Sequence, residues 1–266
     1  LLISYKFVSE NSCSLKAPKY FKVNLFAKNI DWRRNIKVAS NGDVFVVESY
    51  TGNIKVLRDN DNDGKSDMEK IFAKGFNKPF GIDINNGFLY IADTDFVWKI
   101  PYIPGHLVQK SKAIKVTEPN ALGDSSGHWT RNIAIKENKM YIAIGSRGNI
   151  EIEEYPRATI QELDLITNRQ INFATGIRNP IGLDFHPITK KLFAVVNERD
   201  GMGDNLVPDY FSKINQDNFF GWPYFYLGNN IQPKIKIPED FKKILVNVPD
   251  VLFKSHSCLL YTSDAA

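Results

Sequence analysis

The chain has 266 residues, a hydrophobic fraction of 43% and a net charge of +4. Its basic residues are scattered rather than gathered in a stripe, which argues against nucleic-acid binding, and no apolar run approaches the roughly 18 residues of a membrane span. Two cysteines, Cys13 and Cys258, allow at most one disulfide and do not decide the redox compartment.

The two ends of the chain are expected to lie outside the folded domain. Residues 1–20 form an N-terminal tail, in which "LLISYKFVSE" is a possible leader remnant without an initiator Met or a basic region. Residues 258–266, "CLLYTSDAA", match the in-frame translation of a transposon adapter used in sequencing libraries, and we interpret them as a non-native tail. The predicted domain therefore covers residues 21–257.

Four segments of this domain share one pattern, in which an alternating apolar strand, a polar turn and a second apolar strand follow one another. The second strands are predicted to open at Val44, Leu89, Met140 and Leu192, with spacings of 45, 51 and 52 residues. Repeats of this length made of short strands are typical of β-propeller blades. We therefore predict an all-β propeller, of which this chain holds about four blades and part of a fifth.

The connection inside the first repeat, "DNDNDGKSD", carries the clearest metal signal. Gly64 permits a sharp turn, and four carboxylates within nine residues repel one another without a cation. Position twelve is Lys70 rather than the Glu of an EF-hand, so the loop is the shorter DxDxDGxxD variety. The predicted ligands of a structural calcium ion are Asp59, Asp61, Asp63, Asp67 and the carbonyl of Lys65. The alternative is an acidic turn held open by water.

The third and fourth repeats open with "GHWTRNIAI" and "GIRNPIGLDFHP", which place polar side chains at comparable strand entrances. A histidine such as His128 has an ordinary pKa near working pH and is suited to act as a general base. Arg131, Arg178 and Asn179 are suited to an anionic or carbonyl-rich ligand. The alternative is that these are ordinary surface residues beside turns.

These motifs, together with "VNERDGMGDNLVPDY", "FFGWPYFYLG" and "PDVLFKSHS", resemble the pyrroloquinoline quinone (PQQ)-dependent sugar dehydrogenases. The resemblance covers about residues 21–257 and is strongest to the L-sorbosone dehydrogenase-like branch, which is related to soluble glucose dehydrogenase. It implies a six-bladed propeller with PQQ across the channel mouth and Ca²⁺ beneath the quinone. It also implies a sugar substrate, an electron acceptor such as a cytochrome or a quinone, and a secreted or periplasmic location.

The resemblance also implies roles for individual residues. His128 corresponds to the base that takes the proton of the sugar hydroxyl while hydride passes to the quinone. Arg178 and Asn179 correspond to the pair that touches the reactive carbonyls of the cofactor, and Arg178 stabilises developing charge. Asp200 and Gly201 are the nearest equivalents of two successive backbone carbonyls that hold the cofactor Ca²⁺. Further basic residues for the carboxylates of the quinone come from later blades in the family.

Two other functions remain open from the sequence. One is a non-catalytic, calcium-stabilised propeller that serves as a binding module. The other is a calcium-dependent, lactonase-type hydrolase, to which Asn35, Asn132 and Asn179 would contribute ligands at the channel centre. Arg178 fits poorly beside a catalytic cation in such a site.

Overall fold

A computed structural model describes residues 17–28, 30, 32–203 and 205–254 of the chain. Most of the predicted N-terminal tail, the adapter-like segment 258–266 and both cysteines lie outside these residues. In the described part, the single helix is a short 3-10 turn, Glu239–Lys243, and no helix is long and apolar enough to cross a membrane. The fold is nearly all-β, as predicted.

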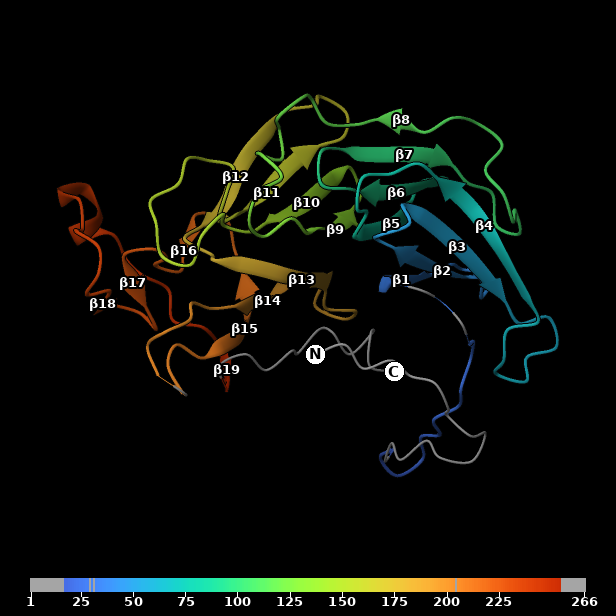
Figure 1. The fold of residues 1–266 in the computed structure, drawn as a ribbon, viewed down its shortest axis with the longest axis horizontal. Coiled ribbons are helices and arrows are strands. Elements are labelled where there is room, and N and C mark those ends of the chain that lie inside the picture. Colours follow the sequence, from blue (N-terminus) through green and yellow to red (C-terminus); the bar gives the residue numbers. More distant parts are fainter. Residues whose placement is uncertain (1–16, 29, 31, 204, 255–266) are drawn as a thin grey trace.

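Four antiparallel sheets follow one another along the chain and form four blades around an arc (Figure 1). The first blade contains β1 (Arg33–Val38), β2 (Val44–Glu48), β3 (Asn53–Arg58) and β4 (Met68–Lys74). The second contains β5 (Gly81–Asn85), β6 (Phe88–Ala92), β7 (Val97–Pro101) and β8 (Ile114–Lys115). The third contains β9 (Arg131–Lys136), β10 (Lys139–Ile144), β11 (Thr159–Asp164) and β12 (Gln170–Thr175), and β16 (Asn218–Phe219) adds to it in parallel. The fourth contains β13 (Asn179–Phe185), β14 (Leu192–Asn197), β15 (Asp209–Ile214) and β19 (Val251–Phe253).

The blade repeat predicted from the sequence is confirmed. The four second strands begin at Val44, Phe88, Lys139 and Leu192, each within one residue of its predicted start. In the second blade, Asn86 and Gly87 both have positive φ, 46° and 76°. Two such residues in a row give the hairpin turn whose twist matches that of the flanking strands. A hairpin of β17 (Phe225–Tyr226) and β18 (Asn230–Ile231) lies beyond the fourth blade.

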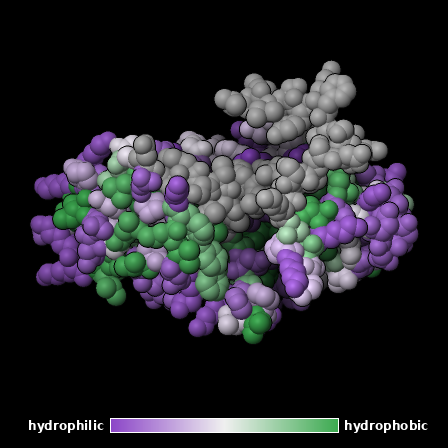
Figure 2. Space-filling model, turned by 90° about the horizontal axis from the view of Figure 1, so that it is seen from below, coloured by the Kyte–Doolittle hydropathy of each residue, from purple (hydrophilic) through white to green (hydrophobic). Residues whose placement is uncertain are grey.

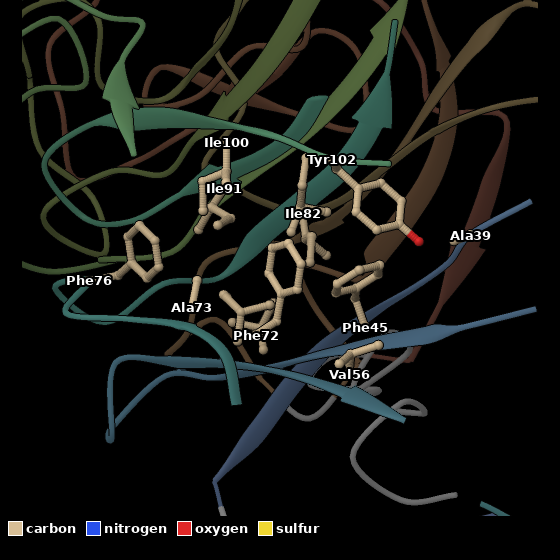
Figure 3. Packing of buried hydrophobic residues seen from close by; sticks show 13 residues of the cluster. Ala39, Phe45, Val56, Phe72, Ala73, Phe76, Ile82, Ile91, Ile100 and Tyr102 are labelled. Carbon is tan, nitrogen blue, oxygen red and sulfur yellow. The ribbon is translucent and has the colours of Figure 1, made fainter. Parts of the chain in front are cut away.

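Buried aromatic and aliphatic side chains join neighbouring blades. Between the first and second blades, Phe45 and Phe72 pack edge-to-face against each other at 5.1 Å (Figure 3). Tyr102, which follows β7, meets both rings edge-on at 5.1 and 5.8 Å. A blade alone cannot bury both of its faces, so this contact between blades supplies the core.

The innermost strands β1, β5, β9 and β13 line the inner side of the arc (Figure 1). Neighbouring inner strands approach closely. A Cβ atom on Gly81 of β5 would overlap the carbonyl oxygen of Arg131 in β9, so only glycine fits there. Since β9 and β13 are neighbours that run in the same direction, their first residues lie at the same end of the channel. The strand entrances that carry the candidate residues are therefore brought together.

Both ends of the arc present exposed apolar side chains. Hydrophobic surface gathers on the side of the molecule that holds the fourth blade and the β17–β18 hairpin (Figure 2). Leu252 in β19 and Val248 just before it are 48% and 65% exposed. At the first blade, the rings of Trp32 and Tyr50 pack together at 4.7 Å while both remain exposed. These are surfaces of the kind that neighbouring blades cover for one another.

Candidate active site

His128 lies on the connection that leads into β9 and is held by the chain that leaves β10. Its Nδ1 atom is 2.7 Å from the carbonyl oxygen of Ser146 and 3.1 Å from the Ser146 hydroxyl. The backbone N–H of His128 donates to the same carbonyl at 3.1 Å. A carbonyl only accepts, so Nδ1 carries the hydrogen and the lone pair of the neutral ring is on Nε2.

The surroundings of His128 favour its neutral form. Burial, and then the positive charge of Arg178, lowers the pKa of His128 from 6.5 to about 4. The carboxylate of Asp200 opposes this shift but does not outweigh it. At neutral pH the ring is therefore unprotonated and able to accept a proton.

Asn179, the first residue of β13, borders the same glycine, Gly145, as His128. A Cβ atom on Gly145 would lie 2.6 Å from the Oδ1 atom of Asn179 and 2.7 Å from the Cβ atom of His128. The Asn179 side chain is 7% exposed, and none of the described residues gives its Oδ1 atom a hydrogen bond. A buried amide oxygen without a partner is costly and is common where a ligand binds.

Arg178 is buried beside this pair and is held from the far side by the segment after β14. Its guanidinium donates to the carbonyl oxygen of Glu198 at 2.7 Å and lies 3.4 Å from the carboxylate of Asp200. Its own carbonyl accepts the N–H of Ser146 at 2.7 Å, which links it to the support of His128. No described residue accepts from its Nε atom. The structure thus brings together His128, Arg178 and Asn179.

Arg131, predicted to bind cofactor, has a different position. Its side chain is fully buried, and it donates to the carbonyl oxygens of Leu122 at 3.1 Å, Asp124 at 2.9 Å and His128 at 2.9 Å. These bonds occupy the guanidinium with backbone. Arg131 therefore supports the connection that carries His128 and does not present donors to the channel.

Asp200 and Gly201 lie on the exposed connection after β14, next to Arg178. Asn149 forms two hydrogen bonds with the Asp200 backbone, of 2.8 Å to its N–H and 3.0 Å to its carbonyl oxygen. The indole N–H of Trp222 donates to the carbonyl of Asn149 at 3.0 Å. These hydrogen bonds hold the connection after β14 against the segment that begins at Ser146. As a result, the Asp200 carboxylate stays close to Arg178.

The acidic loop joins β3 to β4 and lies at one end of the arc (Figure 1). Asp59, Asp61 and Asp67 each offer an oxygen atom, and these atoms lie within 4.8 Å of one another. Asp63 lies outside this group, and its carboxylate accepts the N–H of Lys65 at 2.8 Å. The loop thus assembles three of the four predicted carboxylates. Burial tends to raise the pKa of Asp59, but backbone N–H groups, first that of Gly64, lower it overall.

The asparagines of the lactonase alternative do not form one cluster of free ligands. Asn35 donates to Asn132 at 3.4 Å beside a cavity of about 270 Å³ lined by both residues. The Asn132 amide is bonded to backbone, donating to Ile181 at 3.0 Å and accepting from Ile133 at 2.9 Å. Asn179 faces His128 instead. The geometry therefore favours the histidine-centred site.

Three features of the site were not predicted from the sequence. They are the carbonyl of Ser146 that binds His128, the close approach of Gly145 to His128 and Asn179, and the hydrogen bonds between Asn149 and the Asp200 backbone. All three belong to "GSRGN", which directly follows the second strand of the third blade. A glycine followed by small polar residues at the end of a buried strand was the one available signal. It does not say which backbone atom meets the histidine.

The fold and this site define a β-propeller protein with a histidine, an arginine and an asparagine at one end of its inner strands. A family model described as TrAA12-like matches residues 15–219, and the chain belongs to this family. The resemblance to PQQ-dependent sugar dehydrogenases is thereby confirmed at the level of the family.

Several known proteins are similar to this chain. An uncharacterized protein of Borreliella burgdorferi is 30% identical over 230 residues, covering 82% of this chain and 58% of that protein. The chain thus spans less than two thirds of this relative. The calcium structure of the family AA12 enzyme of Trichoderma reesei has a TM-score of 0.74 at 15% identity, covering 87% of this chain and 70% of that one. The holo PQQ domain of Coprinopsis cinerea pyranose dehydrogenase has a TM-score of 0.70 at 18% identity, covering 85% and 66%. These two structures show the fold.

Proposed function

We propose that the chain carries the proton-accepting half of a PQQ-dependent sugar dehydrogenase site. The observation that carries the proposal is the placement of His128, with Nδ1 bound to the Ser146 carbonyl at 2.7 Å and Asn179 and Arg178 alongside. The family match and the similarity to the PQQ domain of a pyranose dehydrogenase support it.

The residues at this site fit a flat group that is rich in carbonyl and carboxylate oxygens. Arg178 Nε, Asn179 Oδ1 and Asn197 Oδ1 are buried, and no described residue satisfies them. The Nε–H of Arg178 is a donor for such an oxygen. The two amide oxygens only accept, so they suit an N–H or O–H group of the ligand or of the sugar. PQQ, when bound, supplies a two-electron acceptor for the hydride of the substrate.

Proton transfer, charge stabilisation and ligand orientation are assigned to individual side chains of this chain. The Nε2 atom of His128 takes the proton of a sugar hydroxyl, and the fixed Nδ1–H···O=C bond stabilises the ring as it becomes charged. Arg178 remains positive and favours negative charge that develops on an adjacent oxygen. Asn179 orients the carbonyl-bearing ligand through its amide.

Two calcium sites belong to the proposal. The carbonyls of Asp200 and Gly201 would hold the cofactor ion. Asp59, Asp61 and Asp67 would hold a structural ion, with the Lys65 carbonyl and Asp63, which lies outside their group, as secondary ligands. Oxygen donors of this kind suit Ca²⁺. The sugar, an acceptor such as a cytochrome or a quinone, a ring of six blades and a secreted or periplasmic location are further parts of the proposal.

The test is a titration of the chain, and of a version extended to the length of its relatives, with PQQ and Ca²⁺. Dye reduction is then assayed with aldoses. We expect saturable PQQ binding and aldose-dependent reduction, with His128→Asn lowering turnover about 10²- to 10⁴-fold. The control is His186→Asn on the exposed β13–β14 turn, where the ring accepts the N–H groups of Ile188 and Thr189.

The outcomes separate the alternatives. Binding of PQQ without sugar oxidation would support a binding module instead. Calcium-dependent lactone hydrolysis without PQQ binding would support the hydrolase. Full turnover of the His128→Asn variant would remove His128 from the role of base.

A further inference from the structure

Residues 122–128, the segment that ends at His128, are anchored at their start by Leu122, which is fully buried in the core, and are held further by two buried arginines. Beyond Leu122, Asp124, Ser126 and Gly127 are exposed, so little apolar packing fixes that part of the segment. Besides the three bonds from Arg131, the Arg157 guanidinium donates to the carbonyl oxygens of Asp124 at 2.9 Å and Ser126 at 2.6 Å. The Asp124 carbonyl thus accepts from both arginines.

Arg157 also reaches the segment that carries the partner of His128. Its Nε atom lies 3.7 Å from the carboxylate of Glu153, and the Arg157 and Glu153 side chains are 4% and 1% exposed. Glu153 accepts the backbone N–H groups of Arg147 at 2.5 Å and Gly148 at 3.0 Å, directly after Ser146. Arg157 is therefore in contact with both segments that hold the imidazole.

The two segments also touch each other. Gly127 has φ of +64°, and a Cβ atom there would overlap the carbonyl of Arg147. Such an approach leaves no room for a side chain, so the relative placement of the two segments decides whether His128 meets the Ser146 carbonyl.

We propose that Arg131 and Arg157 are positioning residues for His128, which fix the 122–128 segment against the 146–153 segment so that the imidazole keeps its bond to Ser146. This inference rests on the proposed function for its effect on turnover. Its structural part concerns only the described residues and can be measured without PQQ.

If this arrangement is lost, we expect kcat to fall and KM to stay nearly the same. A displacement of about 1 Å in a reacting group can cost about 10²-fold in rate. The hydrogen bonds of both guanidinium groups go to backbone carbonyls, and the Arg157 Nε atom lies 3.7 Å from Glu153, so KM has no reason to change.

The experiment compares Arg157→Met and Arg131→Met with Arg58→Met in the extended protein. Arg58 is a matched control, because its guanidinium also holds a carboxylate and a carbonyl, those of Asp43 at 2.7 Å and Gly105 at 2.9 Å. We expect hydrogen exchange of the 122–128 amides to become about 10-fold faster or more in both site variants and to stay unchanged in the control. We also expect kcat to fall about 10²-fold in the site variants, with KM within about 2-fold.

Lysine variants keep the test decisive if a methionine variant does not fold. Arg157→Lys keeps the charge but loses the planar fork that spans two carbonyls, so we expect intermediate exchange and partial recovery of kcat. Unchanged exchange of 122–128 in Arg157→Met or Arg157→Lys would overturn the inference, and so would a rise in KM with unchanged kcat. If the wild-type protein bound no PQQ, the proposed function would fail, while the exchange data would still decide the positioning role.

Discussion

His128 and Asn179 both border the place that a Cβ atom of Gly145 would take, with their nearest atoms 2.7 and 2.6 Å from it. The two side chains come from the entrances of different blades. Their spacing is thus set by a glycine that belongs to neither entrance, because any larger residue would separate the base from the amide.

Substituting Gly145→Ala tests this relationship. We expect a loss of stability of about 1–3 kcal/mol, because the added methyl group overpacks a buried contact. We also expect turnover to fall about 10²-fold as His128 or Asn179 moves. Urea unfolding and dye-reduction kinetics measure the two effects.

Ser146→Ala is the companion variant for this experiment. It removes the hydroxyl at 3.1 Å from Nδ1 but keeps the carbonyl at 2.7 Å. Turnover should stay within about 3-fold of wild type, since the stronger acceptor is retained. A large loss in Ser146→Ala would show that the hydroxyl, not the carbonyl, holds the ring.

The pH dependence of turnover follows from the lowered pKa of His128. A base with a pKa of about 4 is unprotonated above that pH, so kcat/KM should be level from pH 7 down to about 5 and fall near 4. Replacing Arg178 with Met removes a positive charge that disfavours the imidazolium, so the acid limb should move to higher pH. A wild-type limb near 6.5 would contradict the burial and charge effects described for the ring.

The same shift affects stability. The unfolded His128 binds a proton below about 6.5, whereas the folded residue does so only below about 4. Because the unfolded state binds more protons in this window, stability falls as the pH is lowered from 6.5 to 4, by at most about 1.4 kcal/mol per pH unit. Urea unfolding of wild type and His128→Gln at pH 7 and 5 measures the effect. The variant should lose less stability than wild type over this interval.

The blades could be predicted because they leave periodic signals, and the meeting of His128, Arg178 and Asn179 at one end because their positions at the strand starts do. Apolar residues that alternate with polar ones, followed by turn residues, predict the strands. The residues before Arg131 and Pro180 stand where the inner strands β9 and β13 begin, and the blade topology brings these strand starts to the same end of the channel. The hydrogen bonds of Arg131 could not be predicted, since a buried arginine bonded to carbonyls and a ligand-binding arginine look alike in sequence. The Ser146 carbonyl is a backbone atom, which every residue has, and only the packed structure shows that it meets His128.

The acidic loop offers a matched pair of variants for the predicted structural calcium ion. Asp59, Asp61 and Asp67 gather their oxygen atoms within 4.8 Å of one another, and Asp63 lies outside this group. Calcium that binds only the folded loop raises the melting temperature by mass action, and the rise is lost when a ligand is removed.

Asp59→Asn should therefore abolish the calcium-dependent rise in melting temperature, while Asp63→Asn should retain most of it. The comparison is thermal unfolding in about 5 mM calcium and in excess chelator. This concentration is about 5- to 50-fold above the Kd range, about 10⁻⁴–10⁻³ M, of extracellular calcium modules. Because both substitutions remove one negative charge from the same loop, a general relief of repulsion would affect them equally. Equal responses of the two variants would contradict a site built on Asp59, Asp61 and Asp67, and a rise confined to wild type and Asp63→Asn would support it.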